Sequence, residues 1–443
     1  MPAIGPFFTG AKQLSIDLAE PVVYLRGSSG DRTTHVLQGE VSIVLTKPMV
    51  ATQIIIKFVG KSYILWPEGV GPRGNTVYHE KVIHEQNLIL QSFHPKSEGT
   101  LDVGLHRWPF QFLLSNQLVE TIEDECGKVS YYLTTTVHRV GVAATKIRAR
   151  RDILLLRTPQ WSDAALTANS LPSTSIVYER KLNICDASIC IEKSSCSSGT
   201  QLPIAISISP LVKHVFVESI SVILVEKRIY KLPQYQARRV ELHDFKVVLT
   251  SVTSLIDPML THAIVPQLSL KDIHRALGTK NAHIALNEGP FQHRLIFTLP
   301  NCVNLNHSST YNEIHITHTL KLHIELTSIN HLNQMTRTQI KLDTPITILD
   351  CRLKEDYNTL PTYEEAILSD PVISEEEECK PTGFFICPCY LEYKKKNQCS
   401  KRDWMKLRNE SHSTSSSTTD VHYHQHYNTM IPPPSYEDLA SKQ

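Results

Sequence analysis

The chain has 443 residues, of which 41% are hydrophobic and 20% are charged, and its formal net charge at pH 7 is +1. This length allows two ordinary domains and a tail, and the composition is typical of a soluble globular protein, not of a disordered one. The small net charge argues against a dedicated nucleic-acid-binding protein, which usually carries a strong basic excess. We therefore expect no nucleic-acid partner.

The first residues and the cysteines predict the compartment. Residues 1–6 have neither the basic flank nor the apolar stretch of a signal peptide, and the ten cysteines form no regular framework. The sequence contains no run of about 18 apolar residues that would span a bilayer. We expect a cytoplasmic protein whose cysteines are mostly thiols.

Residues 14–158 show the pattern of β-strands and contain no convincing amphipathic helix. In the clearest strand, at residues 129–137, Val129, Tyr131 and Leu133 fall on one face and the more polar residues between them fall on the other. Many short strands separated by turn residues predict an antiparallel β-sandwich. The other strands are predicted at residues 36–45, 53–59, 77–83, 88–90, 110–114 and 146–156.

Residues 159–175 contain two prolines and many small polar residues, which predicts a linker, and residues 176–350 predict a second sandwich. In its strongest strand, at residues 313–326, His318 interrupts an apolar face. The two halves repeat a similar order of strands, which predicts a duplicated, all-β, immunoglobulin-like fold. The remaining strands are predicted at residues 182–191, 203–208, 215–230, 240–250, 295–299 and 338–349.

Two motif-like patterns fail as cofactor or metal sites. Residues 69–74 fit G-x-G-x-x-G, but the residues that follow alternate like a strand, so we predict a hairpin loop and not a dinucleotide site. Three alternating histidines in residues 422–426 lack a cysteine or carboxylate at zinc-site spacing. We expect no cofactor, no metal site and no enzymatic activity.

Residues 351–443 are predicted to be a disordered tail, because charged and serine/threonine-rich runs replace the strand pattern. Near its end, Pro432-Pro433-Pro434-Ser435-Tyr436 forms a PPxY motif. Consecutive prolines hold the polyproline II conformation that fits the aromatic groove of a WW domain, and a tyrosine adds a rigid ring. An imperfect copy stands upstream, with leucine in place of the first proline. The predicted WW-binding residues are Pro433, Pro434 and Tyr436, assisted by Leu360, Pro361 and Tyr363.

Two more surfaces allow several interpretations. Residues 384–390, which contain Cys387 and Cys389, are followed by three lysines. They fit a membrane-touching acylated patch, a segment that folds back onto the sandwiches, or a partner motif. Lys146, Arg148 and Arg150 fall on one face of a predicted strand. This basic patch fits either a solvated sheet face or a site for acidic cargo segments or anionic lipid head groups.

Two sandwiches, a short linker and a tail with Pro-x-Tyr motifs resemble the α-arrestins, the arrestin-related trafficking adaptors of fungi and animals, and favour a fungal member. The resemblance covers residues 14–350 and rests on residues 36–41, 58–60, 104–112, 131–133 and 153–157. It implies the arrestin fold and an adaptor that links membrane cargo, a transporter or receptor, to a HECT-type ubiquitin ligase with WW domains.

Further expectations follow from this resemblance. The ligase would attach ubiquitin to the cargo, which would then be endocytosed and sorted, and the basic patch would contact acidic cargo segments. The protein would be cytoplasmic and recruited to the plasma membrane and endosomes, with peripheral membrane contact. Two alternatives remain open: an arrestin-like scaffold of ambient-pH signalling, and a coat-type endosomal sorting subunit.

Overall fold

The computed structural model describes residues 11–70, 75–93, 99–139, 146–159, 174–255, 270–286, 290–329 and 334–353, together with Cys387 and Cys389. Most of the predicted linker and most of the predicted tail lie outside the described residues. The same holds for all six predicted WW-binding residues: Leu360, Pro361, Tyr363, Pro433, Pro434 and Tyr436.

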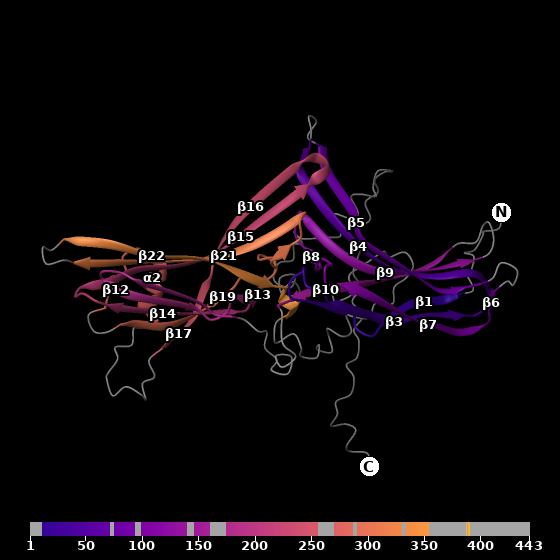
Figure 1. Ribbon diagram of the computed structural model, residues 1–443, viewed down its shortest axis with the longest axis horizontal. Helices are drawn as coiled ribbons and strands as arrows, with labels where there is room; N and C mark the ends of the chain where they lie inside the picture. The colour runs from indigo at the N-terminus through magenta and orange to yellow at the C-terminus, as the bar shows by residue number, and fades with distance from the viewer. Residues whose placement is uncertain are drawn as a thin grey trace, which may run out of the picture. The chain divides into compact units, whose positions relative to one another are not determined.

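The first sandwich consists of a three-stranded and a seven-stranded sheet, and Figure 1 shows β3 and β7 in one layer and β4 and β9 in the other. The smaller sheet has the order β1-β3-β7, and the larger has the order β2-β10-β9-β4-β5, with β6 beside β4 and β8 beside β9. The strands are β1 (Ala11–Leu18), β2 (Val22–Arg26), β3 (Thr34–Leu45), β4 (Met49–Val70), β5 (Asn75–Ser92), β6 (Gly99–Leu101), β7 (Gly104–Ser115), β8 (Ile122–Glu123), β9 (Gly127–Arg139) and β10 (Ile147–Thr158).

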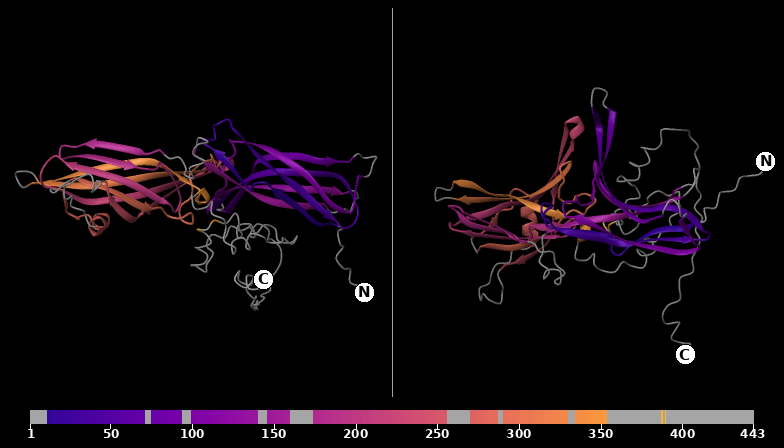
Figure 2. Two further views of the ribbon diagram at one scale, coloured as in Figure 1. Left: turned by 90° about the horizontal axis from the view of Figure 1, so that it is seen from below. Right: turned by 45° about the vertical axis from the view of Figure 1, so that its right-hand side comes forward.

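The second sandwich also has two layers, and Figure 2 shows both sandwiches from two further directions. A five-stranded sheet has the order β11-β12-β14-β19-β17, and a seven-stranded sheet has the order β13-β22-β21-β15-β16, with β18 beside β15 and β20 beside β21. The elements are β11 (Ile176–Lys181), β12 (Cys185–Ile191), β13 (Ser195–Ser197), β14 (Gln201–Pro210), β15 (Val215–Leu232), η1 (Pro233–Tyr235), β16 (Ala237–Lys246), β17 (Val248–Ser254), α2 (Leu270–Gly278), β18 (Ile284–Ala285), β19 (Phe291–Thr298), β20 (Ser309–Thr310), β21 (Ile314–Ile329), β22 (Met335–Leu349) and η2 (Cys351–Leu353).

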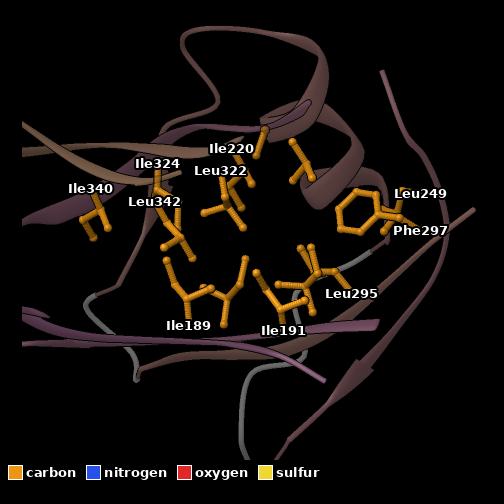
Figure 3. Close-up of a cluster of buried hydrophobic side chains, with 14 of the residues drawn as sticks. Ile189, Ile191, Ile220, Leu249, Leu295, Phe297, Leu322, Ile324, Ile340 and Leu342 are labelled. Atoms are coloured by element: carbon orange, nitrogen blue, oxygen red, sulfur yellow. The ribbon is translucent and has the colours of Figure 1, made fainter. Parts of the chain in front are cut away.

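The predicted fold of tandem β-sandwiches is confirmed, and the period-two pattern explains why it forms. In β9 every second residue from Gly127 to Val137 is buried, and the residues between are half exposed. Figure 3 shows the result in the second sandwich, where Ile189 and Ile191 of β12 face Leu322 and Ile324 of β21. All four side chains are fully buried, and each contributes about 1.5–3 kcal/mol from the hydrophobic effect.

Several predicted strand bounds were wrong. The stretches predicted at 77–83 and 88–90 form the single strand β5, and β4 runs eleven residues beyond the predicted end at residue 59. The strand predicted at 182–191 starts later, at Cys185, as β12. A turn separates it from the preceding strand β11, and in this turn the Leu182 amide donates to the Cys185 carbonyl oxygen at 2.9 Å. The stretch at 240–250 is divided between β16 and β17, which belong to different sheets.

Two features were absent from the prediction. Helix α2 packs Ile273 and Ala276, one turn apart, into the core of the second sandwich.

Each sandwich also contains one parallel strand pair among its described strands: Leu154 of β10 lies opposite Val22 of β2, and Thr347 of β22 lies opposite Ser195 of β13. A parallel pair needs a long crossover connection, which local sequence patterns do not reveal.

The structure agrees with the interpretation of the glycine-rich stretch as a hairpin. Val70 of β4 lies opposite Asn75 of β5, so the described residues after the motif form a strand and not the helix that a dinucleotide site needs. Among the described residues, no helix is both long enough and apolar enough to cross a membrane.

Candidate functional site

The predicted basic patch lies at the start of β10, in the seven-stranded sheet of the first sandwich. Lys146 and Arg148 are exposed, and Arg150 is half buried. Arg148 lies opposite Thr136 of β9, and Arg150 lies opposite Thr134. Alternation along β10 therefore places Arg148 and Arg150 on one face, as predicted, and Lys146 directly precedes the strand.

The three basic residues differ in how their charge is engaged. The Arg150 guanidinium lies 3.8 Å from the ring centroid of Tyr132, and its Nη2 is 3.1 Å from Asp152 Oδ1. Among the described residues, no carboxylate pairs with Lys146 or Arg148. Partial burial, and then the positive charges of Lys146 and Arg148, lower the pKa of His138. The free positive charge of the patch is therefore concentrated at Lys146 and Arg148.

A buried polar cluster joins strands of both sandwiches, and sequence reasoning did not find it. Its centre is Arg228 of β15, whose Nη1 lies 3.0 Å from Asp124 Oδ1, just after β8, and whose Nε lies 2.6 Å from Glu226 Oε1. Asp124 also accepts hydrogen bonds from Tyr230 and, at 2.7 Å, from Asn306 Nδ2. Burial would lower the pKa of Arg228, but the charges of Asp124 and Glu226 outweigh it and raise that pKa.

His318, which interrupts the apolar face of β21, belongs to this cluster. Its Nε2 lies 3.1 Å from Glu226 Oε2, and its Nδ1 lies 2.9 Å from Ser308 Oγ. A carboxylate can only accept, so Nε2 carries the proton of the neutral ring and Ser308 donates to Nδ1. Burial lowers the pKa of His318 despite the charge of Glu226, which keeps the ring neutral.

The acidic member of this pair is held in its charged form. Burial would raise the pKa of Glu226, but the hydrogen bond from His318 and the charge of Arg228 outweigh it and lower that pKa. The Asn306 backbone amide donates to Glu226 Oε2 at 2.8 Å. Removing one member of such a buried ionic network leaves the remaining charges buried without a partner, which is strongly destabilising. The arrangement in which all members are paired is therefore favoured, and it holds these strand ends together.

A cleft of about 500 Å³ lies beside this region, lined by residues of β10, β13 and β22. Its charged lining groups are engaged with neighbours. Arg157 Nε lies 2.9 Å from Glu120 Oε2, and the Asp350 carboxylate accepts from Arg352 Nη2 at 2.8 Å. Arg157 also donates to the carbonyl oxygens of Asn116 and Leu118, so it supports the loop before β8 and adds no free charge to the exposed basic face.

The sequence does carry a signal for the buried cluster. In β15, the inward-facing positions Ile220, Val222 and Leu224 continue in the same register to Glu226 and Arg228. Charged residues in the apolar register of a strand indicate a buried ionic network, because an unpaired charge there is too costly. Their partner Asp124 could not be identified from sequence, since it lies in the other sandwich, 104 positions away from Arg228.

Comparison with known proteins agrees with this architecture. Residues 21–161 match the family described as "Arrestin (or S-antigen), N-terminal domain". A putative arrestin-related trafficking adapter of Schizosaccharomyces pombe is 26% identical over 427 residues, which cover 86% of this chain and 59% of that protein. A second such adapter from the same yeast is 26% identical, covering 81% of this chain and 74% of its own length.

A third relative carries a more specific name. A probable HECT-type ubiquitin ligase-interacting protein of Aspergillus clavatus is 24% identical over 229 residues, which cover 50% of this chain and 37% of that protein. The chain thus spans about three fifths of the length of the first of these relatives, and all three are fungal. The N-terminal match, the tandem sandwiches and these relatives all agree with the resemblance to the α-arrestins.

Proposed function

We propose that this chain is a non-enzymatic adaptor that brings a WW-domain HECT-type ubiquitin ligase to a membrane transporter or receptor. The ligase ubiquitinates this cargo, which is then endocytosed and sorted. The adaptor acts in the cytoplasm and is recruited to the plasma membrane and endosomes. The observation that carries the proposal is the combination of two arrestin-type sandwiches with a PPxY motif at residues 433–436.

Two independent observations support the ligase-binding part of the proposal. Relatives that align with about half of this chain are named as probable HECT-type ubiquitin ligase-interacting proteins. The motif that ends in Tyr436 has the prolines and the aromatic ring that WW domains bind, and the imperfect motif that ends in Tyr363 has the same order. Two motifs on one chain raise avidity, because the second binding event becomes intramolecular.

The cargo-binding part is supported by the exposed basic face of β10. Side chains at alternate positions of a strand lie about 7 Å apart, which is also the repeat of alternate side chains in an extended peptide. Lys146 and Arg148 therefore match two acidic residues separated by one position. Such a contact would be weakened by salt, since both basic side chains are exposed.

Binding of the full chain to isolated WW domains tests the ligase contact. Tyr436→Ala is expected to remove most of the binding, Tyr363→Ala to reduce it, and the double variant to abolish it. Tyr235→Ala is the matched control, because this tyrosine of η1 is 49% exposed and lies outside both motifs. Undiminished binding of the double variant would refute the proposed docking.

Cargo uptake in cells tests the basic face separately. The variant Lys146→Glu/Arg148→Glu is expected to bind the ligase normally and to slow uptake of the cargo. Its matched control is Arg337→Glu/Lys341→Glu, which reverses two exposed charges on β22 of the second sandwich. Equal uptake in the two variants would exclude the β10 face as the cargo contact and leave the ligase contact standing.

A further inference from the structure

Four cysteines that are far apart in the sequence converge at one end of the second sandwich. Cys302 lies in the turn region between β19 and β20, and Cys351 is the first residue of η2. Cys387 and Cys389 come from a segment more than 30 positions after the last strand. The Sγ atoms of all four lie within 4.8 Å of one another.

The geometry of this cluster differs from that of disulfides. None of the four cysteines forms a disulfide, and Cys302 Sγ lies 3.0 Å from Cys387 Sγ, well beyond the bond length of about 2.05 Å. Thiols are weak hydrogen-bond donors and acceptors, so mutual contacts among four of them give little reason for such convergence. A bound ion gives a much stronger reason.

The dimensions of the cluster match a single tetrahedral metal ion. Zinc binds thiolate at about 2.3 Å, so the six edges of a Zn(Cys)4 tetrahedron are each about 3.8 Å. The upper separation of 4.8 Å requires shifts of only about 1 Å to reach this arrangement. The site is also sheltered, since Cys351 is buried and the other three cysteines are half buried.

We propose that Cys302, Cys351, Cys387 and Cys389 bind one zinc ion in a closed, structural site. Four soft thiolate ligands in a tetrahedral arrangement select zinc over calcium and magnesium, which prefer oxygen. All four coordination positions are supplied by the protein, so no position remains for a catalytic water. Binding releases the protons of the thiols that become thiolates, and no bond between sulfur atoms forms or breaks.

The zinc ion would tie the segment at Cys387 and Cys389 to the second sandwich. Two ligands belong to the sandwich, and the other two follow Cys351 by 36 (387 − 351) and 38 (389 − 351) positions. Of the three interpretations of this segment, the structure thus supports the one in which it folds back onto a sandwich. The motif at residues 360–363 would then lie in the segment between the ligands Cys351 and Cys387, whose two ends are both held by the zinc ion. The motif at residues 433–436 would lie after the last ligand, Cys389.

Metal analysis of the purified full-length chain tests the site. We expect about one zinc ion per chain and no iron. Cys389→Ser and Cys387→Ser are expected to lose most of the zinc, and both positions lie outside the sandwich strands, so the fold should persist. Cys190→Ser is the matched control, because Cys190 is a half-buried free thiol of β12 outside the cluster, and this variant should retain the zinc.

Chelation provides a second measurement. A strong zinc chelator should lower the thermal unfolding temperature of the wild-type chain and of Cys190→Ser, and should leave that of Cys389→Ser unchanged. It should also make four additional thiols reactive toward a maleimide in the wild-type chain. A folded wild-type chain without zinc, iron in place of zinc, or a disulfide or acyl group on Cys387 or Cys389 in the intact mass would overturn the proposal.

Discussion

The buried cluster around Arg228 makes a strong prediction for the variant Arg228→Met. Arg228 is 3% exposed, and its guanidinium contacts the carboxylates of Asp124 and Glu226, both fully buried. Methionine fills a similar volume and removes the charge, which leaves two buried carboxylates without their cation. Breaking a buried pair in this way costs about 3–5 kcal/mol, which is about two to three and a half powers of ten in the folding equilibrium.

The pH dependence of this loss has a defined sign. In the variant, burial still raises the pKa of Glu226, and the charge and hydrogen bond of Arg228, which lower that pKa, have been removed. A carboxyl group whose pKa is raised in the folded state is destabilising at high pH, and stability recovers as pH falls and the group binds a proton. The difference between wild type and Arg228→Met should therefore shrink between pH 7 and pH 5.

Denaturant unfolding, followed by fluorescence and by circular dichroism at each pH, measures these differences. Both probes are needed, because a chain with two sandwiches need not unfold in one step. The matched control is Lys57→Met, which removes an exposed cation 3.0 Å from Glu85 and should cost less than about 1 kcal/mol. A loss for Arg228→Met as small as that of the control, or one that stays constant with pH, would refute the reasoning.

Three further variants test other parts of the structure. Burial lowers the pKa of His318, so wild-type stability should fall as pH drops below about 6.5, and His318→Gln should flatten that slope in urea unfolding at several pH values. An added Cβ at Gly39 would lie 2.2 Å from a backbone carbonyl oxygen of β1, so Gly39→Ala should cost about 1–3 kcal/mol, whereas Gly30→Ala, with 3.7 Å of space, should change the unfolding midpoint little. Leu322→Ala should cost about 2–5 kcal/mol, against a small change for the exposed control Val177→Ala; equal losses would contradict the assigned core.

Local patterns in the sequence were enough to predict the fold class. The alternation of buried and exposed residues in β9 and β21 involves only residues that are neighbours in the chain, so it can be recognised without knowing the partner strands. The end of β4 was missed because the pairing register with β5 shifts between Gly60 and Lys61, and such a bulge moves the alternation to the other face. In β5, polar residues at 84–87 resembled a turn, but β5 ends its sheet, where a polar strand is tolerated.

The candidate sites were predictable to different degrees. The shared face of Arg148 and Arg150 follows from strand periodicity alone, but the stacking of Arg150 on Tyr132 depends on the neighbouring strand. The thiol cluster was not predicted, because its ligands come from separate segments and only Cys387 and Cys389 show a motif-like spacing. Helix α2 was missed because it is only nine residues long, and its core-facing residues Ile273, Ala276 and Leu277 span little more than one turn.

The parallel pairs of β10 with β2 and of β22 with β13 bear on how the chain folds during its synthesis. Leu154 pairs with Val22, 132 positions earlier (154 − 22), and Thr347 pairs with Ser195, 152 positions earlier (347 − 195). During synthesis on the ribosome, β2 cannot pair with β10, and β13 cannot pair with β22, until almost all of the same sandwich has been made. Non-local pairing of this kind is slow, and it leaves strand edges exposed to aggregation until the last strand arrives. We therefore expect nascent chains that stop before Thr158 or Leu349 to depend on chaperones, whereas a chain that has passed those residues can close its sheets unaided.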